Sequence, residues 1–306
     1  LFIIGGSGWT DRSCDNFYNF VNENCLPVTT SFRRQDLFDH KDKNYVGSFG
    51  TSVSPELIGS IADSDLIVVL GARLGEMTTN GYTTLSPQKH SKDMIHIHVD
   101  PSELNKVYNA DLCINIGVEE CCEKLKDVKL ENSKRWQKWT NELRRNYEKD
   151  IKPTKNKILN NLGNIFEIVE EALPKKSIIT LDAGNNAAWP QRFLRYGRKR
   201  RQIATTCGSM GYAIPAAVSS ALLNPGQTVL CCVGDGGFMM SSQEISTAVH
   251  HGVKLIILII NNSSYGTIRM HQEREYPGQK IATDLKNPDF VKLCKAMGAD
   301  AYRVKG

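Results

Sequence analysis

The sequence contains no hydrophobic run that approaches the about 20 residues of a membrane-spanning helix, so we expect no membrane association. It also has no charged start followed by an apolar core, so no secretory signal peptide is expected. At 41% hydrophobic and 23% charged residues, the composition is that of a soluble globular protein. Its 306 residues are enough for two domains, each with its own core.

Cysteine pairs with metal-binding spacing are also absent. The nine cysteines are an odd number, and none forms a Cys-x-x-Cys pair, which argues against structural zinc. Cys231 and Cys232 lie in an apolar run, where free cysteine behaves as a small apolar residue. We therefore expect a reduced, cytoplasmic protein.

The sequence has no strong charge imbalance. The formal net charge of +5 is small for this length. Part of it lies in a basic run made up of Arg192, Arg195, Arg198, Lys199, Arg200 and Arg201. No nucleic-acid-binding motif accompanies this run, so we expect a solvated or phosphate-facing surface and no nucleic-acid partner.

The most informative stretch covers residues 228–268. Residues 229–233 and 255–260 are apolar runs with the length and β-branched content of buried strands. Between them, Ile245, Ala248 and Val249 have helical spacing. Strand, helix and strand in this order predict a right-handed crossover between parallel strands. Both strand ends then open at the carboxyl edge of the sheet, where open α/β sheets bind ligands.

The loops at these two strand ends predict a magnesium–diphosphate site. Asp235 supplies a carboxylate oxygen after the first strand, and Asn262 supplies an amide oxygen after the second. Mg²⁺ prefers oxygen ligands and usually keeps phosphate oxygens among them. Gly236 and Gly237 let the backbone approach a phosphate, beside the N–H groups of a helix start. An ordinary turn with a surface Asp is the competing interpretation, and the pairing of the two loops favours the metal site.

Residues 1–125 predict a Rossmann-like domain in which strands alternate with helices. The full Gly-x-Gly-x-x-Gly fingerprint is absent, and Gly5-Gly6-Ser7-Gly8 fits a tight turn at least as well as a phosphate site. Residues 32–50 are polar, and we expect a long connection there. The expected strands are residues 1–4, 27–30, 65–70, 94–99 and 112–116, and the expected helices are a segment ending near residue 24 and residues 54–62 and 118–125.

Residues 126–155, rich in Lys and Glu, predict a linker with a docked helix on which Trp136 and Trp139 pack. Residues 156–306 predict a second domain. Its expected elements are a helix at 164–173 with Ile165, Ile168, Val169 and Ala172 on one face, a strand at 177–181, a small-residue helix at 213–222 and short helices around 290–297. Four loops, 182–189, 206–211, 234–238 and 261–267, are expected to converge on one sheet edge, as a cofactor site requires.

The Gly-Asp-Gly of residues 234–236 and the Asn261-Asn262 that ends the crossover resemble the cofactor-binding motif of thiamine diphosphate enzymes. Nearly the whole chain resembles the acetolactate synthase-like branch of that family. The resemblance implies an α/β fold of two doubly wound parallel-sheet domains, a Rossmann-like central domain (residues 1–125) and a thiamine diphosphate-binding domain (residues 156–306). It implies thiamine diphosphate and Mg²⁺ as cofactors and a 2-keto acid as substrate, for decarboxylation and carboligation.

The resemblance also implies roles for individual residues. Asp235, Asn262 and the backbone oxygen of Ser264 would hold the metal. Met210 would wedge beneath the bent cofactor, where the alternative is a core methionine that fills a gap. The remaining cofactor contacts would be Asn185, Asn186, Gly208, Ser209, Gly236, Gly237, Tyr265, Gly266 and Thr267.

Family members also use a glutamate on a separate pyrimidine-binding domain to activate the cofactor. Because residues 1–125 resemble the central domain, we expect that domain upstream of Leu1, with no catalytic acid among these 306 residues. We therefore expect these residues alone to be inactive, and the complete enzyme to be a homodimer or homotetramer. Acetolactate synthases carry a substrate-shaping tryptophan where this chain has His271, which predicts a different substrate or acceptor unless His271 is an ordinary surface residue.

Three other functions compete with this interpretation. One is a 2-keto acid decarboxylase of the benzoylformate decarboxylase-like kind, and another is a non-catalytic nucleotide-binding protein built on the first domain. The third is a flavin enzyme, since acetolactate synthases carry FAD in the central domain. Residues 47–50 and 73–76 depart from the pattern of the FAD-containing members, so we expect no FAD and keep Arg73 as a candidate contact.

Overall fold

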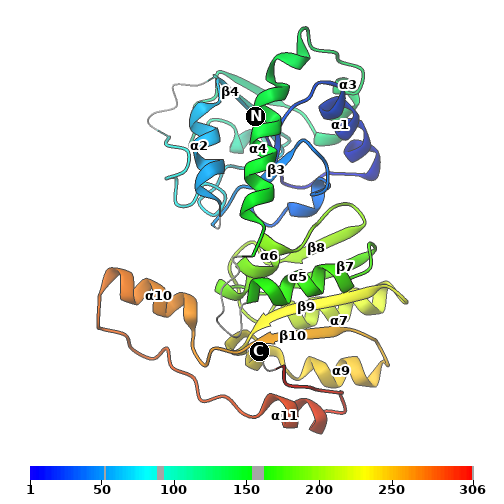
Figure 1. The fold of residues 1–306 in the computed structure, drawn as a ribbon, viewed down its shortest axis with the longest axis vertical. Coiled ribbons are helices and arrows are strands. Elements are labelled where there is room, and N and C mark those ends of the chain that lie inside the picture. The colour runs from blue at the N-terminus through cyan, green and yellow to red at the C-terminus, as the bar shows by residue number, and fades with distance from the viewer. Residues whose placement is uncertain (52, 88–92, 154–161, 305–306) are drawn as a thin grey trace. The chain divides into compact units, whose positions relative to one another are not determined.

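The computed structural model describes residues 1–306 except residue 52 and residues 88–92, 154–161 and 305–306. The chain forms two compact units, which are described separately (Figure 1). Unit 1 comprises Leu1–Lys152 with Arg195–Arg198, and unit 2 comprises Pro153–Leu194 with Lys199–Gly306. The predicted boundary between residues 155 and 156 lies outside the described residues. Among the helices that the structure describes, none is long and apolar enough to cross a bilayer.

Unit 1 is built on a six-stranded sheet in the order β3-β2-β1-β4-β5-β6, in which every neighbouring pair runs parallel. The strands are β1 (Phe2–Ile4), β2 (Val28–Thr30), β3 (Tyr45–Ser48), β4 (Leu66–Leu70), β5 (Asp93–His98) and β6 (Leu112–Asn115). The helices are α1 (Asp11–Glu23), α2 (Pro55–Asp63), α3 (Val118–Leu125) and α4 (Gln137–Asp150). Short 3-10 turns cover Gln35–Leu37, Pro101–Glu103 and Ser133–Trp136.

Both faces of this sheet are covered. Successive side chains of a strand point to opposite faces, and Phe2 and Ile4 of β1 enter one core while Ile3 enters the other. Residues of α1 and α3 fill the first core, and residues of α2 fill the second. This arrangement confirms the doubly wound fold that the sequence predicts for unit 1.

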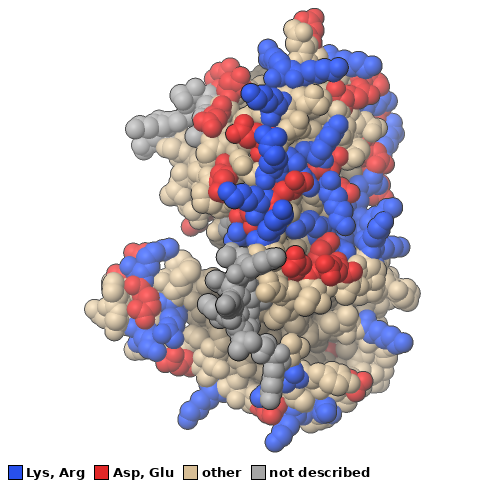
Figure 2. Space-filling model, viewed as in Figure 1, with Lys and Arg blue, Asp and Glu red and all other residues tan. Residues whose placement is uncertain are grey.

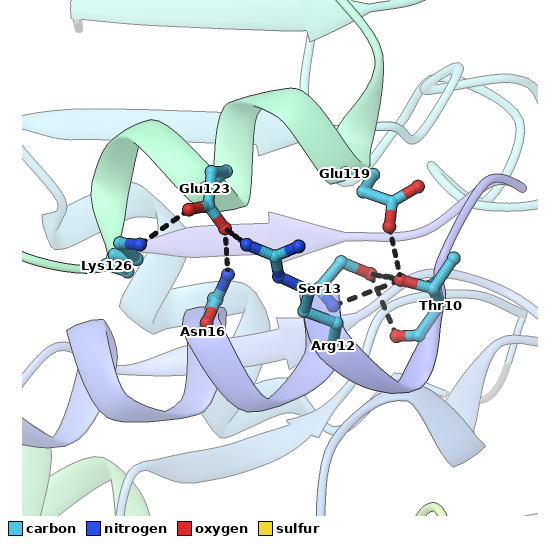
Figure 3. Close-up of polar contacts among 7 residues, drawn as sticks. All are labelled: Thr10, Arg12, Ser13, Asn16, Glu119, Glu123 and Lys126. Atoms are coloured by element: carbon cyan, nitrogen blue, oxygen red, sulfur yellow. Dashed lines mark hydrogen bonds and ion pairs between the residues drawn. The ribbon is translucent and has the colours of Figure 1, made fainter.

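A polar seam joins α1 to α3 at the surface (Figure 3). Glu123 accepts hydrogen bonds from Arg12 and Asn16, both 2.9 Å long. The hydroxyl of Thr10, which caps α1, donates to Glu119 at 3.1 Å. The Arg12–Glu123 ion pair is largely exposed, so solvent screens it and it contributes little to stability. The seam therefore fixes how the helices lie more than it stabilises the fold.

The expectation of a plain connection at residues 32–50 is wrong. The segment contains β3, which forms the edge of the sheet, and it buries Phe38, Tyr45 and Phe49. The strand is only four residues long and carries Gly47 at a φ of +127°, so the apolar run that usually signals a strand is interrupted.

The glycines after β1 lie where two backbone segments cross closely, because a Cβ on Gly6 would lie 1.9 Å from the carbonyl oxygen of Gly71.

Helix α4 belongs to the surface of unit 1. Trp136, just before it, packs on the first core and donates from Nε1 to the Asn24 carbonyl at 2.6 Å, and Trp139 packs on the second core. Both tryptophans therefore have the packing role that the sequence predicts. Figure 2 shows Lys and Arg side chains mixed with Asp and Glu around this helix, and Arg144 pairs with Glu148 one turn on. The mixture of both signs indicates a solvated face.

Unit 2 is built on a four-stranded parallel sheet in the order β10-β9-β7-β8. Its strands are β7 (Ser177–Leu181), β8 (Arg200–Ala204), β9 (Thr228–Gly234) and β10 (Ile256–Ile260). The helices are α5 (Leu162–Ala172), α6 (Ala188–Phe193), α7 (Ala213–Leu223), α8 (Asp235–Ser241), α9 (Glu244–His250), α10 (Gly266–Glu275) and α11 (Phe290–Ala296), with a 3-10 turn at Asn185–Ala187. The small residues of α7 let this helix pack closely on β7 and β9.

Several predictions for unit 2 need correction. The basic run does not form only a solvated surface, because its last two residues begin β8, where Arg200 is 6% exposed and pairs with Glu170 of α5. Helix α5 buries Phe166 instead of the predicted face, and Ile168 is 66% exposed.

The second strand of the crossover is not buried. β10 is an edge strand of the described sheet, and Ile256 is 54% exposed. The helix after Gly-Asp-Gly is divided into α8 and α9.

Candidate functional site

The candidate site begins where β9 and β10 end. These strands are paired in parallel with Ile260 opposite Gly234, so Asp235 and Asn261 follow from adjacent strand ends. The Asp235 side chain is almost completely buried, and its Oδ2 accepts a hydrogen bond from Nδ2 of Asn287 at 2.6 Å. The same nitrogen donates to Oδ1 of Asn261 at 3.0 Å. Asn287 is not among the residues that the sequence predicts for the site.

The two glycines after Asp235 lie where no larger residue fits. A Cβ on Gly236 would be 2.6 Å from Cε1 of Tyr265 and 3.3 Å from Cε of Met210. A Cβ on Gly237 would be 1.9 Å from Oδ2 of Asp182. A real Cβ does not approach other atoms this closely, so a larger residue at either position would require Tyr265 or Asp182 to move. The structure thus brings Met210, Tyr265 and Gly236 together from three of the four predicted loops.

Asp182 holds the loop that carries Met210. Its carboxylate is fully buried and accepts hydrogen bonds from the backbone N–H groups of Gly211 (3.1 Å) and Tyr212 (3.2 Å). Gly208 and Gly211 have φ values of +74° and +83°, which glycine adopts without strain. Ser209 lies exposed between them. Asp182 was missed as a site residue, although its place directly after a buried strand at the carboxyl edge is a signal that could have found it.

The loop after β7 contributes Asn185 and Asn186. The backbone N–H of Asn185 donates to Oγ1 of Thr267 at 2.8 Å, which joins this loop to the start of α10. The side chain of Asn185 is exposed. In the amide orientation that satisfies both of its neighbours, Asn186 donates to the Ala183 carbonyl and accepts from the Gly234 N–H, both at 3.1 Å. Asn186 therefore braces the ends of β7 and β9, while Asn185 faces solvent.

The fourth loop holds the other two predicted metal ligands. Oδ1 of Asn262 accepts a hydrogen bond from the Ser264 N–H at 3.1 Å, and the Ser264 carbonyl accepts one from the Gly266 N–H at 2.8 Å. Each of these oxygens has a second lone pair with which it can bind a cation. The loop itself is fixed by a bridge between Ser264 and Asp284. All four predicted loops thus converge on one sheet edge.

The cysteines of unit 2 fall into two groups. Burial raises the pKa of Cys231 to about 12 and the pKa of Cys232 well above its usual range, so both remain neutral thiols in the core, as the sequence predicts. Cys207 is exposed on the loop of Met210. Its hydrogen bond with the Thr205 hydroxyl, helped by the Ser209 N–H, lowers the pKa of this thiol.

The residues present fit a divalent cation that takes some of its oxygen ligands from the protein and others from a diphosphate. Within the described residues, no three His, Cys, Asp or Glu side chains cluster as a metal site. The groups at this edge that could bind a cation are the carboxylate of Asp235 and the neutral oxygens of Asn262 and Ser264. An oxygen set with a single charge suits Mg²⁺, which completes its shell with phosphate oxygens. Beside it, the buried Gly236 and Gly237 pack against Tyr265, Met210 and Asp182.

The fold and the site define a parallel α/β protein with a glycine-lined, oxygen-rich site at a sheet edge. The family model described as "Thiamine pyrophosphate enzyme, C-terminal TPP binding domain" matches residues 182–306. The model described as "Thiamine pyrophosphate enzyme, central domain" matches residues 1–125. The chain belongs to the thiamine pyrophosphate enzyme family, which confirms the resemblance drawn from its motifs.

Similar proteins are acetolactate synthase large subunits. That of Parasynechococcus marenigrum is 26% identical, with 99% of this chain and 49% of the relative aligned. That of Buchnera aphidicola is 28% identical, with 100% and 54% aligned. A probable acetolactate synthase large subunit of Methanocaldococcus jannaschii is 27% identical, with 99% and 53% aligned. The chain spans about half the length of the curated relatives it matches.

Proposed function

We propose that this chain is the central and cofactor-binding part of an acetolactate synthase-like enzyme that depends on thiamine diphosphate and Mg²⁺. The enzyme would decarboxylate a 2-keto acid and join the product to a second carbonyl. The observation that carries the proposal is the buried carboxylate of Asp235 at the end of β9, beside two glycines with no room for a Cβ and next to the Asn261-Asn262 that follows β10. We further propose a cytoplasmic homo-oligomer.

Individual residues would share the work of binding the cofactor. Asp235, Asn262 and the Ser264 carbonyl would bind the metal. Met210, whose Cε lies 3.3 Å from where a Cβ on Gly236 would be, would support the bent cofactor. Backbone groups would provide most other contacts, from Gly208 and Ser209 to the aminopyrimidine and from Gly236, Gly237, Tyr265, Gly266 and Thr267 to the phosphates. When bound, thiamine diphosphate supplies a thiazolium carbon that adds to a carbonyl and accepts the electron pair left by carbon dioxide.

The chain's own contribution is to position charge and to limit motion. Asp235 balances part of the cation's charge, and its burial limits competition from water for the same oxygen. Asp182 fixes the backbone around Met210, so the wedge position is set before any ligand arrives. Preorganisation of this kind lowers the entropy cost of binding.

The test is calorimetric titration of thiamine diphosphate with and without Mg²⁺. We expect binding to require Mg²⁺ and to weaken by at least about tenfold in Asp235→Ala, because the charged ligand of the proposed site is lost. Asp300→Ala is the matched control, since Asp300 is an exposed aspartate of unit 2 outside the four loops. Equal affinity in wild type and Asp235→Ala would disprove the metal site.

A further inference from the structure

The amide of Asn287 bridges the ends of two neighbouring strands. Its Nδ2 lies 2.6 Å from Oδ2 of Asp235 and 3.0 Å from Oδ1 of Asn261. An amide nitrogen carries two hydrogens and no lone pair available for bonding, so it can serve both acceptors at once. Asn261 Oδ1 also accepts from the Ser263 N–H at 3.0 Å, which confirms that this atom is an acceptor. The hydrogen-bond pattern therefore fixes the orientation of the Asn287 amide.

The residues just before and just after Asn287 in the sequence are both anchored to the rest of unit 2. On its N-terminal side, Leu285 donates from its N–H to the Ser263 carbonyl at 2.9 Å, so this segment runs beside the loop after β10. On its C-terminal side, Pro288 restricts the backbone, and Asp289 caps α11 by accepting from the Val291 N–H at 3.0 Å. Anchors on both sides limit how far the Asn287 side chain can move.

Helix α11 is itself attached to the core of unit 2. The rings of Phe290 and Phe238 meet edge to face with centroids 5.1 Å apart, and Phe238 follows the two site glycines on α8. The buried Cys294 of α11 belongs to the same core. The position of Asn287 is thus set by packing that reaches the site from outside the four loops.

We propose that Asn287 is a positioning residue for the metal site, which rests on the function proposed above. By holding Oδ2 of Asp235, it would leave Oδ1 available for a cation, and by holding Asn261 it fixes the start of the loop that carries Asn262. A neutral donor suits this task. A lysine would compete with the cation for the carboxylate, and an aspartate would place a second negative charge against Asp235.

The proposal is tested on the full chain with Asn287→Ala and Asn287→Leu. Leucine has the branched shape and the same number of side-chain heavy atoms as asparagine but makes no hydrogen bonds, so comparing it with alanine separates hydrogen bonding from the loss of side-chain atoms. The measurements are the Mg²⁺ dissociation constant at fixed thiamine diphosphate, by calorimetry, and the melting temperature without metal or cofactor. The matched control is Asn224→Ala, because Asn224 caps α7 through a hydrogen bond to the Ser220 carbonyl.

We expect both Asn287 variants to weaken Mg²⁺ binding by about 10- to 100-fold, the usual effect of removing a partner of a metal ligand. The melting temperature without metal should change no more than in Asn224→Ala. Wild-type Mg²⁺ affinity in either Asn287 variant, or restoration by leucine, would overturn the role of Asn287 and leave the proposed function standing. A wild-type chain whose cofactor binding needs no Mg²⁺ would overturn both.

Discussion

At the scale of single residues, the site is defined by positions that exclude a side chain. Gly236 lies beneath Tyr265 and Met210, and Gly237 lies against the carboxylate of Asp182. The two neighbours differ in how far they can yield. Tyr265 belongs to a partly exposed loop, whereas Asp182 is buried and tied to two backbone N–H groups. The two glycines should therefore respond differently to substitution.

We predict that Gly237→Ala lowers the free energy of unfolding by roughly 3 kcal/mol, because the added methyl displaces a fixed, buried carboxylate. Gly236→Ala should cost less stability, about 1 kcal/mol, and should mainly weaken thiamine diphosphate binding, since the ring of Tyr265 can move. Urea denaturation and cofactor titration measure the two effects. In Gly59→Ala, where a Cβ meets no atom within 4 Å on α2, stability should be unchanged or improved. Equal stability loss in the two site variants would contradict the difference inferred here.

At the scale of elements, α10 links the cofactor site to the surface that could meet a substrate. The helix begins at Gly266, directly after Tyr265, and Thr267 in its first turn accepts from the Asn185 N–H. His271 lies one turn further along, exposed, with Nδ1 3.0 Å from the Arg274 guanidinium. A polar pair on this helix, in place of a tryptophan, would favour a substrate with a polar or charged group.

We predict that His271→Trp shifts the complete enzyme toward apolar acceptor keto acids and that His271→Ala lowers activity with polar ones. The measurement is product analysis with pairs of competing 2-keto acids of different polarity. Gln279→Ala serves as the control, because Gln279 is an exposed polar residue in the turn after α10. Ordinary acetolactate formation that is unaffected by His271→Ala would show that His271 is only a surface residue.

At the scale of the whole molecule, the two units supply a central domain and a cofactor-binding domain. The chain covers about half the length of its acetolactate synthase relatives. Glutamates that could activate the cofactor have other duties here. Glu56 lies in the first turn of α2, and Glu244 begins α9, where an acidic side chain favours the helix start.

We predict that these 306 residues alone do not turn over a 2-keto acid above background, even with thiamine diphosphate and Mg²⁺, because the activating glutamate is expected on another domain. The measurement is the consumption of pyruvate, with a complete acetolactate synthase as positive control. Robust turnover that disappears in Glu244→Gln or Glu56→Gln would place the catalytic acid within this chain and refute the domain assignment.

Several features of the site and of the two sheets depend on contacts between segments that are distant in the sequence, so only the tertiary structure reveals them. Asp182 and Asn287 became site residues only through hydrogen bonds that span 29 and 52 positions of the sequence. Arg200 is buried with Glu170 as its partner, a pairing that the sequence does not show. Strands β3 and β8 lack the apolar run by which a strand is recognised in a sequence. A charged or short strand is stabilised by its partners, which a local pattern cannot report.

The sequence by itself determined the central strands, their parallel direction and the edge at which the loops meet. β1, β4 and β9 are buried over most of their length, so their sequences are nearly continuous apolar runs, and a crossover between parallel strands places both following loops at the same edge. The sequence explains Gly236 and Gly237 by the approach of a phosphate, whereas the atoms that a Cβ at these positions would meet in the structure belong mainly to Tyr265, Met210 and Asp182. The tertiary structure decided which neighbours lie so close, since their distance is set by packing between segments far apart in the chain.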